Sequence, residues 1–298
     1  MKHIIAALAF GLTFVGFAEA KPFKDMFPEV YEVLDAEEKI SVDTMDMQEG
    51  KVKVGANLAE LDLPKGYYFL GAKDARVVLE NLWGNPQAPD TLGMIFPEGI
   101  SPFHNGSWAI EIFFDDIGYV SDEDAGGYDY DELLTGMQKD TKDSNTYRRE
   151  NGYDEIELLG WAAPPHYDAA GRKLYWAKRL RFGESEGETL NYNIRALGRK
   201  GVLVLNFIAG MEELEAVEKA LPDVLNMVTF TEGNRYGDFK PGVDTVAAVG
   251  IGGLIAGKVL AKTGLLVVIL AFAKKFAFLL ILPIIAGFKL LFRRGKDS

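Results

Sequence analysis

Residues 173–208 read KLYWAKRLRFGESEGETLNYNIRALGRKGVLVLNFI, and their pattern determines the fold class. They contain three runs rich in β-branched and aromatic residues, joined by short polar connections with turn chemistry. The runs are 173–182, 189–197 and 202–208. The last run is apolar on both faces, which predicts a central strand that is covered on both sides. Consecutive hairpins of this kind, rather than alternating strands and helices, predict a mainly antiparallel sheet.

The preceding and following residues predict elements that fit such a sheet. Strands are expected at 51–54, 58–63, 67–70, 91–96, 108–114 and 155–161, and helices at 21–40, 74–83, 130–149 and 211–227. Pro222 is expected to kink or split the last helix. The fold class is therefore α+β, a mainly antiparallel sheet of hairpins packed by helices, followed by a C-terminal transmembrane helix region.

The first 20 residues have the three parts of a secretory signal peptide. Lys2 supplies a basic start, an apolar run extends from Ile4 to Ala18, and Ala18-Glu19-Ala20 is a small-x-small cleavage site. Cleavage is expected after Ala20. An uncleaved N-terminal anchor is the alternative, but the apolar run is shorter than the ~20 residues that a membrane span needs.

The C-terminal region is apolar but interrupted by lysines. Residues 245–292 predict a membrane anchor, as one crossing with a neighbouring interfacial segment or as a hairpin of two crossings. The basic residues in 293–298 favour a cytoplasmic C-terminus. With an exported domain this requires an odd number of crossings, so one crossing is preferred.

Charge separates the middle of the chain from its end. The whole chain carries −12, the first 20 residues are neutral, and residues 243–298 carry eight Lys/Arg against two Asp, which leaves −18 for residues 21–242. An acidic domain argues against nucleic-acid binding, whereas a basic apolar tail suits anionic lipid head groups. The absence of cysteine excludes disulfides, thiolate metal sites and cysteine nucleophiles.

These features divide the chain into five parts. They are a signal peptide (1–20), a periplasmic α+β domain (21–230), a linker (231–244), a membrane anchor (245–292) and a basic cytoplasmic tail (293–298).

Several short motifs carry a family resemblance. They are GWAAPPHYD (160–168), LYWAK (174–178), LNYN (190–193), LGRKGV (197–202) and YGDF (236–239). On these motifs the chain resembles a bacterial family of uncharacterised membrane-anchored proteins, domain-of-unknown-function family 2167 (DUF2167). The resemblance covers nearly all of the chain after the signal. It implies a periplasmic domain held at the inner membrane of Gram-negative bacteria, and it brings no reaction, catalytic residue or cofactor. The order of the last strands and helix is also similar to small PsbP-type α+β folds, an analogy of fold only.

Residues 161–168 are the best-defined local feature. Pro164 and Pro165 predict a stiff turn between two strands, which Asp168 closes by accepting backbone N–H bonds. The structural interpretation places Trp161 in the core. The functional alternative is a presented loop in which Trp161, His166, Tyr167 and Asp168 contact a partner.

Motifs for catalysis or metal binding are weak. His104 and His166 lie in loop sequences without ligand spacing, so exposed or loop-bonded histidines are expected. The acidic loop 121–132 begins like a calcium loop, but Gly126 and Leu133 occupy positions five and twelve of the EF-hand pattern, where oxygen ligands belong. Weak calcium binding by this loop stays open. The sequence has no nucleophile elbow, Walker loop or dinucleotide fingerprint.

Two functions follow as hypotheses. The favoured one is a non-enzymatic periplasmic interaction module without a cofactor, whose partners are the lipid bilayer, through the C-terminal segment, and an envelope protein. The alternative is a membrane-tethered hydrolase or metal-dependent enzyme that uses His104 or His166 with carboxylates.

Overall fold

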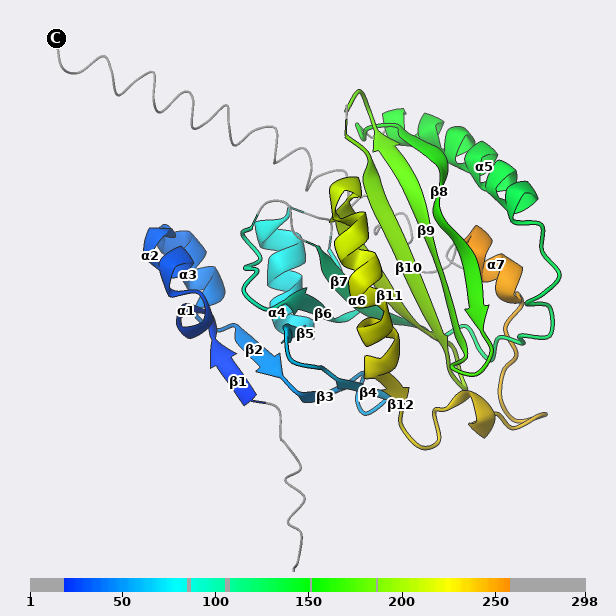
Figure 1. Ribbon diagram of the computed structural model, residues 1–298, viewed down its shortest axis with the longest axis horizontal. Helices are drawn as coiled ribbons and strands as arrows, with labels where there is room; N and C mark the ends of the chain where they lie inside the picture. The colour runs from blue at the N-terminus through cyan, green and yellow to red at the C-terminus, as the bar shows by residue number, and fades with distance from the viewer. Residues whose placement is uncertain (1–18, 85–86, 105–107, 151, 186, 258–298) are drawn as a thin grey trace, which may run out of the picture.

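The computed structural model describes residues 19–84, 87–104, 108–150, 152–185 and 187–257. Within them, nine strands form one antiparallel sheet in the order β1-β2-β5-β6-β7-β11-β10-β9-β8, and three form a second sheet in the order β12-β4-β3 (Figure 1). The strands are β1 Glu19–Pro22, β2 Asp46–Glu49, β3 Lys51–Val54, β4 Ala59–Asp62, β5 Tyr67–Gly71, β6 Thr91–Pro97, β7 Ala109–Asp115, β8 Ile156–Asp168, β9 Lys173–Phe182, β10 Thr189–Leu197, β11 Val202–Gly210 and β12 Val228–Phe230.

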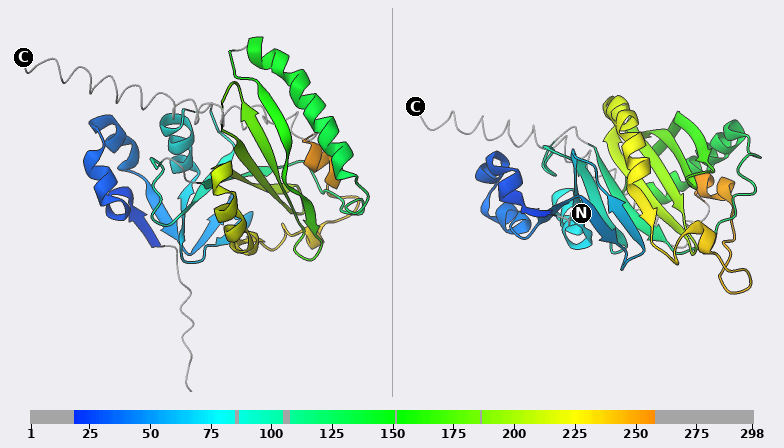
Figure 2. Two further views of the ribbon diagram at one scale, coloured as in Figure 1. Left: turned by 45° about the horizontal axis from the view of Figure 1, so that its top comes forward. Right: turned by 60° about the horizontal axis from the view of Figure 1, so that its bottom comes forward.

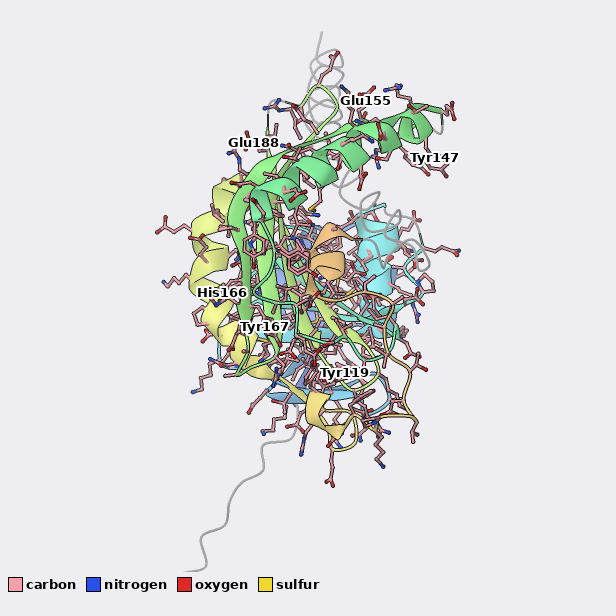
Figure 3. The ribbon with its side chains drawn as sticks, turned by 90° about the vertical axis from the view of Figure 1, so that its right-hand side faces the viewer. Tyr119, Tyr147, Glu155, His166, Tyr167 and Glu188 are labelled. Carbon is pink, nitrogen blue, oxygen red and sulfur yellow. The ribbon has the colours of Figure 1, made fainter. Side chains whose placement is uncertain are left out.

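Helices cover both faces of the large sheet. Helix α6 lies on one face, and α5 and α7 lie on the other, as the side view shows (Figure 3). Short helices α1 to α3 gather beside the β1 edge (Figure 2). The helices are α1 Phe23–Met26, α2 Pro28–Val33, α3 Ala36–Val42, α4 Ala72–Arg76, the π-helical turn η1 Val77–Leu82, α5 Tyr130–Glu150, the 3-10 turns η2 Met211–Glu213 and η3 Tyr236–Asp238, α6 Leu214–Met227 and α7 Ile251–Ala256.

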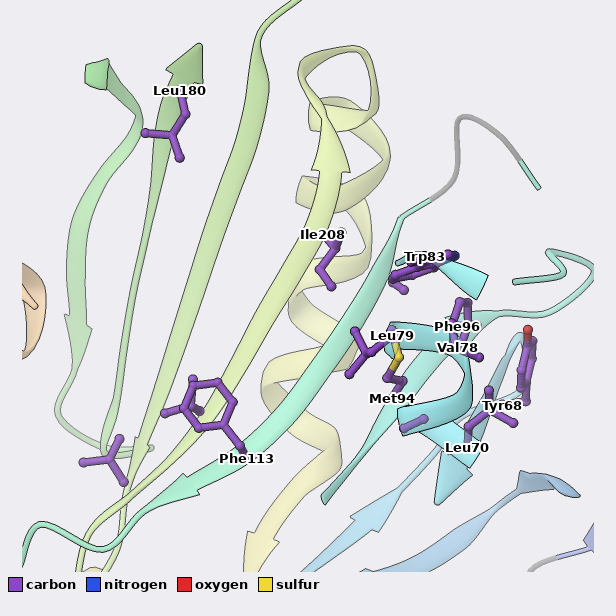
Figure 4. Packing of buried hydrophobic residues seen from close by; sticks show 14 of the residues in the cluster. Tyr68, Leu70, Val78, Leu79, Trp83, Met94, Phe96, Phe113, Leu180 and Ile208 are labelled. Atoms are coloured by element: carbon purple, nitrogen blue, oxygen red, sulfur yellow. The ribbon is translucent and has the colours of Figure 1, made fainter. Parts of the chain in front are cut away.

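The two faces of the sheet belong to two separate apolar cores. On the α6 face, Val217 and Val224 of the helix pack with Ile194 and Leu205 of the sheet. On the opposite face, the sheet packs with η1 and the N-terminal helices at one end, where Tyr68, Met94 and Phe96 meet Val78 (Figure 4). At the other end it packs with α5 and α7. Strands β10 and β11 are buried along their whole length because both cores use them.

The α+β class and the mainly antiparallel sheet are confirmed. The hairpin connecting 51–54 to 59–62, the strands at 173–182 and 189–197 and the long helix near 130–149 all lie where the sequence predicts them. Helix α6 continues through Pro222, so the expected split does not occur. Among the described residues no helix combines the length and apolarity of a membrane span. The part of the predicted anchor after residue 257 lies outside the described residues.

Two stretches differ from the prediction. Residues 21–40 form the end of a strand and then short helices, because Pro28 starts a new helix and Leu34 is extended before Asp35 caps the next one. The predicted turn at 161–168 is instead the second half of strand β8. An edge strand tolerates prolines because one side of its backbone makes no ladder bonds, and the register of β8 shifts around them.

The segment predicted as a linker, 231–244, packs against the domain. Arg235 pairs with Gly198 in an isolated bridge, and the backbone N–H of Arg199 donates to the carbonyl of Asn234 at 2.9 Å. At the other end of the chain, Ala20 pairs with Gln48 in β1, so cleavage after Ala20 would remove the first two residues of that strand. Ala18 lies outside the described residues.

Candidate functional site

A row of polar side chains crosses the middle of the large sheet. Asn191, Asn193 and Arg195 alternate along β10 and therefore point to one face. This is the face that packs with α5 and α7, because Trp176 and Val204, which stand opposite Asn193 and Arg195, belong to that core. The residues named below as the polar row are Glu111, Trp176, Lys178, Asn191, Asn193, Arg195 and Asn206.

The antiparallel register brings these residues side by side. Asn193 stands opposite Asn206 on β11 and opposite Trp176 on β9. Asn206 in turn stands opposite Glu111 on β7, and Asn191 stands opposite Lys178. Four neighbouring strands thus contribute to one continuous row.

Amide oxygens rather than carboxylates hold the buried guanidinium of Arg195. Its side chain is 3% exposed, and its Nη atoms donate to Asn193 Oδ1 at 3.2 Å and to Asn206 Oδ1 at 3.3 Å. The guanidinium lies over the ring of Trp176, 5.2 Å from its centre. Asn193 donates to Asn191 Oδ1 at 2.8 Å. A buried charge needs such partners, because an unpaired one is costly.

The ionisable groups of the row have strongly shifted pKa values. Burial raises the pKa of Glu111 to about 7. Burial and repulsion by Arg195 lower the pKa of Lys178 to about 8. Burial lowers the pKa of Arg195 to about 10, against the attraction of Asp115. Neither Glu111 nor Lys178 has a hydrogen bond or ion pair within the described part of the chain.

A second polar cluster ties the acidic loop to the C-terminal stretch. Asp122 accepts hydrogen bonds from the hydroxyls of Tyr167 at 2.6 Å and Tyr236 at 2.8 Å, and it forms an ion pair with Arg172. Arg172 also lies 4.8 Å from the ring centre of Tyr236. We call Asp122, Tyr167, Arg172 and Tyr236 the clasp. Burial acts to raise the pKa of Asp122, but the two tyrosine hydroxyls and Arg172 outweigh it and lower this pKa.

Further contacts continue along the stretch held by the clasp. Tyr119 stacks on Phe239 at 4.0 Å, and its backbone exchanges hydrogen bonds with Thr245 and Ala247. Arg199 binds Asp244 through two hydrogen bonds of 2.7 and 2.8 Å, and this pairing lowers the pKa of Asp244 to about 2. The chain is therefore fixed to the domain from η3 to α7.

The residues predicted to contact a partner have different positions. Trp161 donates to the carbonyl of Tyr130 at 3.3 Å, Tyr167 belongs to the clasp, and Asp168 accepts the N–H of Ala170, as the sequence predicted for that carboxylate. His166 is exposed, with its ring 5.0 Å from that of Tyr175. Of the four, His166 is therefore the side chain most available to a partner.

The two histidines of the enzymatic alternative are separated by the sheet. His104 is exposed in the connection between β6 and β7, whereas His166 lies in β8, and strands β11, β10 and β9 stand between β7 and β8. No group of three or more metal-ligating side chains occurs in the part of the chain that the structure describes. In the acidic loop, Asp122 and Asp124 bind protein donors, since Asp124 pairs with Tyr128 and accepts the N–H of Ile251.

The sequence contained a signal for the polar row that periodicity alone did not expose. Glu111 is a charged residue at a buried position in the middle of the mostly apolar strand β7, and Arg195 is the one charged residue of the fully buried strand β10. Lys178, Asn191 and Asn193 belong to the motifs LYWAK and LNYN, but only the register shows that these motifs share a face.

Replacing Glu111 by Gln is expected to stabilise the protein at neutral and alkaline pH. The pKa of Glu111 is higher in the folded state than in the unfolded state, so the folded state keeps its proton to a higher pH. The free energy of unfolding therefore falls as pH rises from about 4.5 to 7. The variant removes this loss, which amounts to at most about 3 kcal/mol at pH 8. Urea unfolding at pH 5, 6, 7 and 8 measures the difference. Glu184→Gln, at an exposed position, is the matched control and is expected to show no such trend. Equal pH profiles for Glu111→Gln and wild type would contradict the assignment.

Replacing Asp122 by Asn is expected to loosen the clasp. The variant loses the charge that binds Arg172 and one acceptor for the tyrosines, at a cost of about 1–2 kcal/mol for a partly exposed group. The pKa of Asp122 is lowered, so the difference from wild type is full at pH 7 and disappears as pH falls below about 4. Hydrogen exchange is expected to accelerate in residues 236–247. Asp116→Asn, at an exposed site nearby, should leave that exchange unchanged.

A family model and two solved structures show what the chain resembles. A family model described as protein of unknown function (DUF2167) matches residues 46–285. A comparison with curated protein sequences finds no match. Among solved structures, the solution structure of cyanobacterial PsbP (CyanoP) from Synechocystis sp. PCC 6803 is 8% identical, covers 61% of this chain and 91% of its own, and has a TM-score of 0.36. A point mutant of protein Mog1 is 11% identical, with coverage of 60% and 94% and a TM-score of 0.34. Neither likeness carries an argument at these scores.

Proposed function

The chain belongs to the DUF2167 family of proteins of unknown function, and we propose that it is an exported binding module held at a membrane by its C-terminal segment. The domain would lie in the periplasm, the segment 245–292 in the inner membrane and the tail 293–298 in the cytoplasm. The signal-like first 20 residues and the apolar, basic end of the chain support this topology.

The single observation that carries the proposal is the docking of residues 236–251 on the domain. A flexible linker would be enough to attach a domain to a bilayer. Here the clasp, the Arg199–Asp244 pair and the Tyr119 contacts fix the chain up to the start of α7. A domain fixed in this way has one orientation relative to the start of α7. Fixed orientation is useful to a module that must present one surface to a partner.

Charge supports the same arrangement. The strongly acidic middle of the chain is repelled by anionic lipid head groups, whereas the net +6 of residues 243–298 is attracted to them. The domain is therefore expected to stand off the membrane surface while its end is held there.

Binding rather than catalysis is supported by how the polar groups near β8 are used. Asp122, Tyr167 and Asp168 make contacts inside the domain. The exposed His166, whose ring is tilted against that of Tyr175, is left to meet an envelope protein, and aromatic neighbours of this kind are common in protein contacts.

The membrane part of the proposal is tested by fractionating a Gram-negative host that expresses the full chain. We expect the full chain to stay with membranes after alkaline carbonate extraction, because an inserted segment is not removed by breaking ionic contacts. A chain that ends at Gly257 should appear in the soluble periplasmic fraction. A chain that ends at residue 292 keeps the apolar segment and should remain with the membrane. Recovery of the full chain in the soluble cytoplasmic fraction would reject the proposal.

The partner contact is tested by photo-crosslinking in the same cells. A photoreactive amino acid in place of His166 is expected to give a discrete adduct with an envelope protein, because this side chain is exposed at the sheet edge. The same residue in place of Lys53, exposed on the small sheet, is the matched control. Absence of an adduct at 166, or the same adducts at both positions, would mean that the end of β8 is not a contact surface.

A further inference from the structure

We propose that Lys178, Arg195 and Trp176 form a binding site for an oxyanion, the carboxylate or phosphate group of a ligand. This inference concerns the interior face of the large sheet and does not depend on the membrane tether.

The proposed site contains two positive charges that repel each other. Lys178 and Arg195 belong to the neighbouring strands β9 and β10 and interact repulsively, which contributes to the lowered pKa of Lys178. The guanidinium is bound by amide oxygens, which accept hydrogen bonds from its Nη atoms but carry no charge that would neutralise it. Two partly desolvated cations that repel each other are unfavourable, and an anion bound near both would offset this repulsion.

Lys178 lacks a carboxylate partner among the residues that the structure describes. Asp115 attracts Arg195, but Lys178 has no ion pair with any carboxylate within the described residues. Glu111, at the β7 end of the polar row, forms no ion pair with either cation within the described residues. Outside the described ranges the sequence contains two acidic residues, Glu186 and Asp297. Lys178 is therefore not neutralised by an ion pair with a carboxylate of the described residues.

The proposed site also contains a buried hydrogen-bond donor. Trp176 is only 2% exposed, and its buried indole N–H has no hydrogen-bond acceptor in the described part of the chain. Buried donors are almost always satisfied. Trp176 and Lys178 are two residues apart on the same face of β9, so one ligand can meet both.

These groups select the chemistry of the ligand. Lys178 and Trp176 both donate, and Arg195 adds positive charge beside them. An oxyanion accepts several such bonds at once, and charge-assisted bonds of this type are the strong ones. Lys178 is partly exposed, so the ligand can reach its ammonium from outside. We expect an oxygen of the bound ligand to extend from there to the buried indole N–H of Trp176. A soluble anion and an anionic lipid head group share this chemistry.

The experiment titrates the full chain, purified in detergent, with inorganic phosphate and with acetate in a calorimeter. In parallel, short-chain phosphatidylglycerol and phosphatidylcholine are added to the micelles. Lys178→Met keeps most of the side-chain volume and removes the charge, and Trp176→Phe keeps a ring and removes the donor. Lys53→Met, at an exposed strand position on the small sheet, is the matched control. Lys178→Met also removes the repulsion from Arg195, so we expect the variant to fold.

We expect wild type and Lys53→Met to bind with the same affinity, Lys178→Met to bind about tenfold more weakly or worse, and Trp176→Phe to be weakened severalfold. Binding of phosphate or acetate assigns a soluble oxyanion. Binding of phosphatidylglycerol alone, without phosphatidylcholine, assigns a lipid head group. The proposal is overturned if no anion binds, or if Lys178→Met binds as well as wild type. Loss of membrane attachment in the fractionation experiment would leave these affinities unaffected.

Discussion

The register of β10 between β9 and β11 governs how the other parts of the molecule are arranged. It fixes which side chains of β10 enter which core, because side chains alternate between the faces of a strand. A slip by one residue would send Asn193 and Arg195 into the apolar layer under α6 and bring Tyr192 and Ile194 to the other face. The buried guanidinium would then lose its amide partners, a loss large enough to exclude the alternative. The polar row is thus a device for register as well as a candidate site.

Buried and half-buried polar groups need hydrogen-bond partners, and this need also explains how the acidic loop binds residues 236–251. Asp122 lies in a stretch with the composition of a solvated loop, yet it accepts bonds from segments about 45 and 114 residues further along the chain. Three donors around one carboxylate hold β8, the β8–β9 turn and η3 together. Asp124 accepts the N–H of Ile251 at the start of α7, so the acidic loop binds the chain where it leaves the domain. The order of the stretch 236–251 follows from this loop.

The sequence predicted most of the elements because their patterns are local. The strands at 173–182 and 189–197 and the helix α5 follow from periodicity, and the turn residues mark their ends. The extension of β8 through Pro164 and Pro165 was missed, because only its position at the edge makes prolines acceptable there. The polar row and the clasp were missed for a different reason. Each joins residues from distant segments, and no local pattern shows that Glu111 meets Asn206 or that Asp122 meets Tyr236.

The acidic exterior and the cationic part of the polar row have opposite roles in any recognition of anions. At physiological salt, exposed charges act over only about 8 Å, so the −18 of residues 21–242 sets the approach of a ligand but hardly changes the bonds made to buried groups. A polyanion would meet repulsion along its whole length, whereas a single oxyanion meets it only during approach. At the proposed site, Lys178, Arg195 and Trp176 would act at contact distance, where desolvation strengthens each bond. Repulsion outside and attraction at this site would together favour a small anionic group over nucleic acid, and this discrimination would need no contact with the rest of the ligand.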